Sequence, residues 1–120
     1  MQKSDIRDFM IVETGFESKK YIVMAGHIVD DELCGYSLDD FNDDLTHKTH
    51  KPESISAVYA PVDIEFPFEL DIEEIFLVQN PKVLWKRKPT KLSRKLLSKM
   101  DEKQGKKYLD NLVFPVVIVE

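Results

Sequence analysis

Short apolar runs separated by turn residues fill the first two thirds of the chain. Phe9–Glu13 and Lys20–Ala25 are two such runs with β-branched side chains, and the residues between them, Gly15 to Ser18, are typical of a turn. The pattern predicts a β-hairpin with a loop of roughly four or five residues. Gly26 ends the second run, and His27–Val29 predicts a third short strand.

The following segment combines turn residues with one helical face. Gly35 predicts a turn with a positive φ. Ser37, followed three places later by Asp40, is a partial capping box and predicts the start of a short helical turn. The apolar residues of this turn fall at i, i+3 and i+7 and are Leu38, Phe41 and Leu45.

Three further elements complete this β-rich part. Ser54–Tyr59 begins with the alternation of polar and apolar residues that is typical of a half-buried strand. Asp71–Leu77 predicts a two-turn helix whose acidic residues lie at its N-terminal end, where the helix dipole favours them. Lys82–Arg87 predicts a strand in which Trp85 packs into the core.

The segment after Pro89 has a different pattern. It predicts a single amphipathic helix that ends near Gly105, because four apolar side chains share one side of a helical wheel: Leu92, Leu96, Leu97 and Met100. Leu112–Val119 predicts a last strand, and Pro115 restricts the start of that strand to a sheet edge or a bulge.

Several short strands with tight turns, together with these helices, indicate an α+β fold built on a small antiparallel β-barrel or sandwich. The 120 residues fit one domain. Within this domain we distinguish a β-barrel portion, residues 1–88, from a basic helix and closing strand, residues 89–120.

Charged residues are divided unevenly along the chain. The net charge is −5, but residues 1–81 contain 18 acidic and 6 basic side chains, whereas residues 82–120 contain 4 acidic and 11 basic ones. Such asymmetry is typical of proteins with interaction surfaces of opposite character. The alternative is that the two parts attract each other within the folded chain.

Four carboxylates fall within one acidic turn. Such an array can imitate the spacing of phosphate groups and occupy the nucleic-acid groove of another protein. The alternative is a solvated helix start, at which the dipole favours acids. The candidate protein-binding residues are Asp39, Asp40, Asp43 and Asp44.

Lysines recur every four positions after Pro89 and form a stripe along the predicted helix. A stripe of this kind binds phosphate groups in a salt-sensitive manner that is independent of sequence, and Trp85 or Tyr108 would add base stacking. The acidic pI of about 5.2 argues against a dedicated nucleic-acid binder. The candidate nucleic-acid-binding residues are Lys86, Arg87, Lys88, Lys91, Lys95 and Lys99.

The sequence contains none of the usual catalytic motifs. Cys34 stands beside acidic residues, which disfavour a reactive thiolate. His47 and His50 stand in a polar loop that contains lysines, which indicates two solvated histidines rather than a zinc site. A calcium loop is excluded because Leu45 and Lys51 occupy the places that need Gly and Glu. We therefore expect no enzyme, no cofactor and no metal.

The composition also suggests a compartment. A single cysteine excludes an internal disulfide and favours a reducing environment. Charged residues close to Met1 leave no room for the apolar segment of a signal peptide. The longest uncharged runs, among them Asn111–Val119, are far shorter than the ~20 residues that span a bilayer. We expect a cytoplasmic protein without membrane contact.

Six short motifs stand out along residues 3–88: Lys3–Ile6, Met10–Glu13, Lys20–Val23, Leu38–His47, Ser56–Tyr59 and Val83–Arg87. Together they resemble a family of small proteins encoded by phages and prophages of Gram-positive bacteria. Phe9 stands where that family usually has Gly, and Lys86 replaces an acid. The resemblance implies an SH3-like barrel and a phage accessory protein, and it implies no catalytic residue.

These observations lead to one main functional hypothesis and two alternatives. The main hypothesis is a non-catalytic accessory protein of a phage or prophage that binds a host protein, as an anti-CRISPR inhibitor of host defence does. The first alternative is a small nucleic-acid-binding module that uses the basic C-terminal helix. The second is a barrel that sequesters a small ligand.

Overall fold

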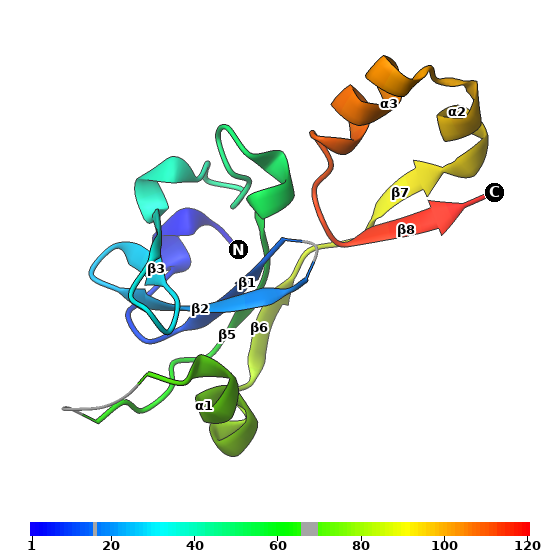
Figure 1. Cartoon of the computed structure of the whole chain (residues 1–120). Helices are drawn as coiled ribbons and strands as arrows, with labels where there is room; N and C mark the ends of the chain where they lie inside the picture. Colours follow the sequence, from blue (N-terminus) through cyan, green and yellow to red (C-terminus); the bar gives the residue numbers. More distant parts are fainter. Residues whose placement is uncertain (16, 66–69) are drawn as a thin grey trace.

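The structure, a computed structural model, describes residues 1–15, 17–65 and 70–120 (Figure 1). An antiparallel sheet in the order β4-β3-β2-β1-β5-β6 forms the body of the molecule. Its strands are β1 (Ile11–Thr14), β2 (Lys19–Met24), β3 (His27–Val29), β4 (Gly35–Ser37), β5 (Ile55–Tyr59) and β6 (Val83–Lys86). Within the described residues β4 and β6 are the two edges, so this sheet is not closed into a barrel. The fold is α+β and mostly antiparallel, with short helices.

The predicted hairpin and the strand after it are confirmed. Ile11 lies opposite Ile22 in the β1–β2 pair, and the loop of this hairpin contains Phe16, which lies outside the described residues. β3 has the predicted bounds and pairs with β2. The predicted strands at residues 54–59 and 82–87 are β5 and β6.

The predicted helix after Asp71 is α1 (Ile72–Gln79). The Asp71 carboxylate accepts the backbone N–H of Glu74 at 3.1 Å, and further acidic residues occupy the first turn. Both features stabilise a helix N-terminus. Asn80 ends the helix in the left-handed conformation, a common C-terminal signal.

Apolar side chains cover both faces of the sheet, because they alternate up and down along the strands. One face packs against the segment between β4 and β5, and its buried residues include Val12, Tyr21, Val23, Ile28, Phe41, Leu45, Ile55 and Val58. The other face packs against α1, and its buried residues are Ile11, Ile22, Ala57, Tyr59, Val62 and Ile72. β5 is buried at every position, so it contributes to both cores.

The segment between β4 and β5 contains two 3-10 turns, η2 (Leu38–Asp40) and η3 (Lys51–Glu53), and a third, η1 (Lys3–Asp5), precedes β1. The predicted cap of η2 is confirmed, since Ser37 Oγ accepts the N–H of Asp39 at 3.2 Å. Phe41 is buried as predicted. However, the chain does not continue as a helix, because Phe41 forms an antiparallel bridge with His47.

The prediction of a positive φ at Gly35 is wrong, and Leu33 has the positive φ of this turn instead. Gly35 is the first residue of β4 and lies opposite Val29 of β3. A Cβ atom added to Gly35 would collide with the carbonyl oxygen of Ile28. Glycine is therefore required here by the close approach of two strands rather than by its backbone angles.

Residues 89–120, which we call the C-terminal lobe, do not form the predicted single helix. They contain β7 (Thr90–Ser93), α2 (Arg94–Lys99), α3 (Glu102–Leu109) and β8 (Val116–Val119). Two caps cause the division. Ser93 Oγ accepts the N–H of Leu96, which starts α2, and Asp101 forms a capping box with Gln104, which starts α3. Gly105 lies inside α3 and does not end a helix.

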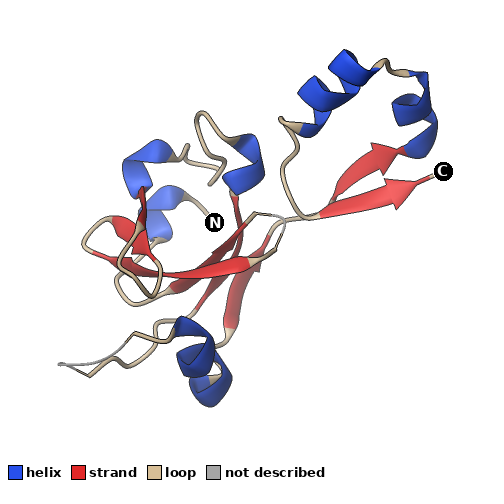
Figure 2. Cartoon of the chain, in the orientation of Figure 1, coloured by secondary structure: helices blue, strands red, loops and turns tan. Residues whose placement is uncertain are grey.

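Only the second half of the predicted last strand, Leu112–Val119, is confirmed, and this strand does not close the main sheet. β8 starts directly after Pro115 and pairs in parallel with β7, and Leu92 lies opposite Ile118. Figures 1 and 2 show this two-stranded sheet and its two helices projecting from the body. The molecule is accordingly elongated, with extents of 53 × 26 × 25 Å. Within the lobe only Leu92 and Leu112 are buried.

We predict that Gly35→Ala lowers the free energy of unfolding by about 1–3 kcal/mol or more, since about 1–3 kcal/mol is typical of overpacked sites. The added methyl group would force β3 and β4 apart. Chemical denaturation followed by circular dichroism would measure the effect.

Gly105→Ala is the matched control. Nothing lies within 4 Å of a Cβ atom at this position, and Ala is the better helix former. The control variant should be as stable as the natural protein or slightly more so. Equal stability of both variants would contradict the close approach at Gly35.

Candidate functional site

The acidic segment, which we define as Asp39, Asp40, Asp43 and Asp44, is brought together by the structure. Asp39 and Asp40 belong to η2, and the other two lie in the turn that follows it. All four side chains are exposed. Lys3 holds this chain segment in place, because its side chain donates to the backbone carbonyl of Phe41 at 3.1 Å.

Asp44 differs from the other three aspartates. Its carboxylate accepts the backbone N–H of Thr46 at 3.0 Å and also the hydroxyl group of Thr46. These hydrogen bonds hold the pKa of Asp44 below its usual value, with a smaller contribution from the charge of Arg87. Asp44 therefore shapes the turn, whereas the carboxylates of Asp39, Asp40 and Asp43 bond to no side chain within the described residues.

Arg87 connects the acidic segment to the sheet. Its Nε and one terminal nitrogen donate to the carbonyl oxygen of Ile55 at 3.1 and 3.0 Å, and the same terminal nitrogen donates to the carbonyl oxygen of Asp44 at 2.9 Å. The guanidinium also lies 5.0 Å from the centre of the Trp85 ring. Burial lowers the pKa of Arg87, and Asp44 opposes that shift. These contacts give Arg87 a structural role within the body.

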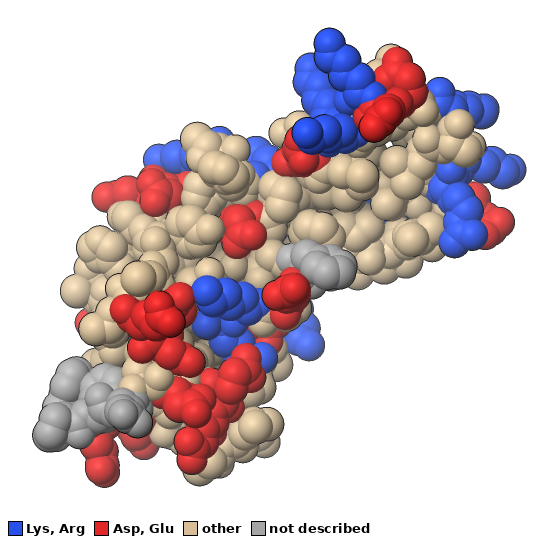
Figure 3. Space-filling view, viewed as in Figure 1, with Lys and Arg blue, Asp and Glu red and all other residues tan. Residues whose placement is uncertain are grey.

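The other basic candidates do not form the predicted stripe. Lys86 ends β6, Lys91 lies on β7, and Lys95 and Lys99 lie on α2. The stripe requires one continuous helix, and the strand and the helix break at residues 90–101 remove it. The five lysines Lys86, Lys88, Lys91, Lys95 and Lys99 are all exposed. On the face that Figure 3 shows, basic side chains gather over the C-terminal lobe and acidic ones over α1 and the nearby sheet.

Ion pairs do not cancel this separation of charge. The ion pairs in the described part of the chain are Lys19–Asp30, Lys20–Glu13 and Lys20–Glu73, at 3.0 to 3.7 Å. All three lie in the body. Within the same residues no ion pair joins the lobe to the body. The opposite charges of the two parts therefore do not attract each other through direct ion pairs.

A groove lies on the lobe between α2 and α3, and we call it the lysine-rimmed groove. Its volume is about 780 Å³. Leu96, Met100 and Tyr108 supply apolar surface, and Lys99 and Lys107 stand beside them. Leu96 is 46% exposed. The groove therefore combines apolar contact surface with positive charge.

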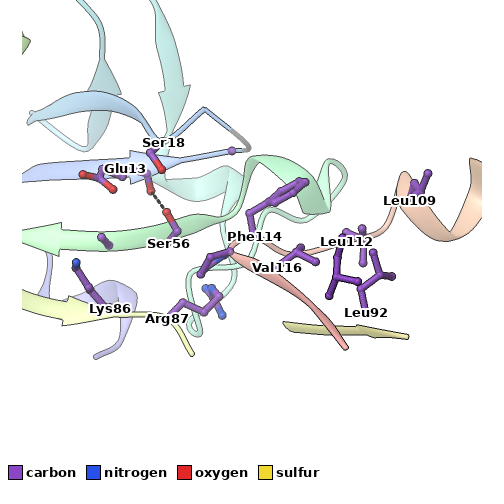
Figure 4. Close-up of a pocket in the computed structure, with 14 residues that line it drawn as sticks. Glu13, Ser18, Ser56, Lys86, Arg87, Leu92, Leu109, Leu112, Phe114 and Val116 are labelled. Carbon is purple, nitrogen blue, oxygen red and sulfur yellow. Dashed lines mark hydrogen bonds between the residues drawn. The ribbon is translucent and has the colours of Figure 1, made fainter. Parts of the chain in front are cut away.

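A second hollow, the interlobe cleft, lies between the body and the lobe and has a volume of about 600 Å³. Figure 4 shows Phe114 between the sheet and the apolar residues of the lobe. The Ser56 hydroxyl group donates to the backbone carbonyl of Glu13 at 3.1 Å and not to its carboxylate. That carboxylate accepts the hydroxyl group of Tyr59 at 2.8 Å. Ser56 and Glu13 of this cleft are thus not arranged as a nucleophile and its base.

His47 is buried, contrary to the prediction of a solvated loop histidine, whereas His50 is exposed. Its ring packs edge-on against Tyr36 and Phe41, with centroids 5.2 and 5.1 Å apart. Its Nδ1 accepts the backbone N–H of His50 at 2.9 Å, which places the ring proton of the neutral form on Nε2. Nε2 is buried and has no hydrogen-bond partner among the described residues.

The described residues offer neither a cluster of metal ligands nor a membrane-spanning helix. They contain no group of three or more His, Cys, Asp and Glu side chains that could hold a metal ion. They also contain no helix with the length and apolar character needed to cross a membrane.

Cys34 is exposed in the turn between β3 and β4. Burial and the Glu13 carboxylate raise the pKa of Tyr59 to about 12, so this hydroxyl group stays protonated at neutral pH.

The chain matches no protein-family model, no curated protein and no solved structure. The resemblance to small phage and prophage proteins therefore stays a prediction.

Most residues that line the two hollows were not predicted as site residues from the sequence, although Lys86, Arg87 and Lys99 were. Leu96 and Met100 were assigned to the buried face of a long helix, and Leu109 and Phe114 were not singled out. The capping pattern of Asp101 and Gln104 was the available signal, because it marks the start of a new helix.

We predict that Arg87→Ala lowers the free energy of unfolding by about 1.5–3 kcal/mol, the usual contribution of hydrogen bonds from a charged donor. Lys88→Ala, a change at the exposed neighbour, should alter it by less than about 0.5 kcal/mol. Urea denaturation would measure both. Equal effects would show that the contacts of Arg87 with Ile55 and Asp44 do not stabilise the body.

We also predict that His47 makes the protein less stable in acid. Burial lowers the pKa of His47 in the folded state, and the charges of Asp40 and Glu53 only partly oppose this. The unfolded chain binds a proton near the ordinary pKa of about 6.5. The stabilisation is therefore complete above that pH and is lost as the pH falls from it toward the lower folded pKa.

Urea denaturation at several pH values between 7.5 and 5, the window around an ordinary histidine pKa of about 6.5, would test this prediction. The slope of stability against pH should be smaller in His47→Asn than in the natural protein. His27→Asn changes an exposed histidine and should leave the slope unaltered. An unchanged slope in His47→Asn would contradict the prediction.

Proposed function

We propose that the protein is a non-catalytic binding protein whose working surface is the lysine-rimmed groove of the C-terminal lobe. The observation that carries this proposal is the combination of exposed apolar and basic side chains in one groove, together with the lack of ion pairs to the body within the described residues. A partner that offers apolar side chains flanked by carboxylates fits this groove. Solvent-exposed lysines at its rim would steer and orient such a partner.

The partial burial of the aromatic side chains favours a protein partner over a nucleic acid. Binding of single strands relies on exposed rings on which bases stack. Trp85 is half-buried against the core and against Arg87, and Tyr108 is half-buried in the lobe. Nucleic-acid binding is the second candidate function, and the exposed lysines of the lobe support it. The net charge of −5 speaks against it.

The acidic segment is a second candidate surface for a protein partner. Asp39, Asp40 and Asp43 have free carboxylates on a chain segment that Lys3 and Arg87 hold in place. This arrangement supports the hypothesis of a protein that imitates nucleic acid. An accessory protein of a phage or prophage that inhibits a host defence protein in the cytoplasm, with a body related to SH3-like barrels, remains our proposal for its biological context.

Sequestration of a small ligand is a weaker alternative. The interlobe cleft, with apolar walls and Lys86 beside them, is the place that such a ligand would occupy. Its apolar residues include exposed ones, among them Leu109 at 47% and Ile118 at 57% exposure. An open cleft of this kind encloses a small molecule less completely than typical ligand pockets do.

We predict that Lys99→Glu combined with Lys107→Glu reduces capture of a protein partner at least tenfold, because it reverses the charge at the rim of the groove. Tagged protein would be incubated with lysate of the source organism, and captured proteins would be quantified by mass spectrometry. Capture by the natural protein should also fall as salt is raised.

Lys88→Glu combined with Lys91→Glu is the matched control. It changes charge by the same amount at exposed positions outside the groove, and it should preserve capture. Asp39→Asn, Asp40→Asn and Asp43→Asn together should preserve it as well. Loss of capture in the aspartate variant alone would show that the acidic segment is the working surface. A gel shift of duplex or single-stranded DNA that depends on Lys99 and Lys107 would contradict the protein-binding proposal.

A further inference from the structure

The sheet of the C-terminal lobe is incomplete. It consists of β7 and β8 alone, and neither strand pairs with any other strand within the described residues. Isolated two-stranded sheets are marginally stable in water, and three or more strands are usually needed. The two helices bury little against it, because only Leu92 and Leu112 are buried in the whole lobe. An additional strand would therefore stabilise this sheet.

β8 has the properties of a strand that accepts a partner. Its four residues, Val116 to Val119, are all β-branched and aliphatic, and two of them are well exposed, Val117 at 45% and Ile118 at 57%. Natural proteins protect free edges with lysine, proline or a covering element. β7 carries Lys91, whereas β8 carries no such protection between its ends. In Figure 1, β8 forms the lower border of the lobe, away from α2 and α3.

We infer that β8 of one molecule pairs antiparallel with β8 of a second copy, which gives a four-stranded sheet in the order β7-β8-β8-β7. This inference does not depend on the proposed function, since it concerns a different surface of the lobe. Pairing of a strand with its own copy needs a two-fold axis perpendicular to the sheet. Such an axis places one residue opposite itself.

The axis passes at Ile118. Val117 then lies opposite Val119 of the second copy, so the central cross-strand pairs are aliphatic and β-branched, a combination that stabilises sheets. The Pro115 carbonyl accepts the N–H of Thr90 at 2.8 Å, so the backbone groups of Pro115 face β7 and, by alternation along the strand, those of Ile118 face the free edge, where they can pair with the second copy. Ile118 is therefore the position at which the two copies face each other directly.

Charge does not oppose this pairing, although the lobe is basic. No charged residue occurs between Asn111 and Val119, and Glu120, which follows β8, lies opposite Val116 of the second copy rather than opposite another charge. Lys91 lies opposite Val117 on β7, so one whole strand separates it from the second copy. At about 4.8 Å per strand, that distance is roughly 10 Å, similar to the Debye length at physiological salt. A second copy therefore fits the edge better than a charged strand would.

Sedimentation equilibrium of the full chain at about 1 µM to 1 mM would test the inference, since small interfaces have affinities in this range. The natural protein should change from monomer to dimer as its concentration rises. Ile118→Lys should weaken the dimer at least tenfold, because it places two like charges directly opposite each other. An equimolar mixture of Ile118→Lys and Ile118→Asp should form a dimer, whereas neither variant does so alone.

Val78→Lys is the matched control. Val78 is 76% exposed on α1 and lies outside the C-terminal lobe, so this variant should dimerise like the natural protein. Circular dichroism would verify that each variant is folded, and rescue in the mixture would exclude misfolding as the cause. A natural protein that stays monomeric throughout the range would overturn the inference. Dimers of Ile118→Lys as strong as those of the natural protein, or a mixture that is not rescued, would also overturn it.

Discussion

The body of this protein depends on one constraint, the burial of β5 on both faces of the sheet. Each residue from Ile55 to Tyr59 is buried, so this strand must find apolar cover above and below. Val58 meets the segment that contains Phe41, and Tyr59 meets α1 through Phe76, with ring centres 4.8 Å apart. The two coverings thus depend on each other, because each encloses one side of the same strand.

The C-terminal lobe follows the opposite logic. Its sequence has enough apolar residues to form a small parallel sheet and two helices but too few to bury them. Its lysines face solvent, whereas Arg87, which precedes the lobe, points into the body. Buried apolar residues are therefore concentrated in residues 1–88, whereas the lobe buries only Leu92 and Leu112. This division is typical of a scaffold that carries a binding element.

The sequence pattern predicted the body better than the lobe, for a physical reason. Strands that alternate or are fully apolar, such as β1 and β5, keep their pattern whatever packs on them. The prediction of a single helix in the lobe is wrong because Leu92, Leu96 and Met100 fit a helical period, although their residues belong to a strand, a helix and a helix break. The four aspartates of the acidic segment lie close together in the structure because they are close in the sequence. The interlobe cleft joins distant elements, and no local pattern encodes it.

Self-association and partner binding would reinforce each other on this lobe. Pairing through β8 leaves the lysine-rimmed groove free, because none of the residues that line the groove belongs to β8. A dimer therefore presents two basic grooves at a fixed spacing, and a partner with two acidic sites binds the second groove at a high effective concentration. Such a gain needs no new contact. It would allow a lobe with a small core and an open groove to bind its partner tightly, which a single groove of this size would not achieve alone.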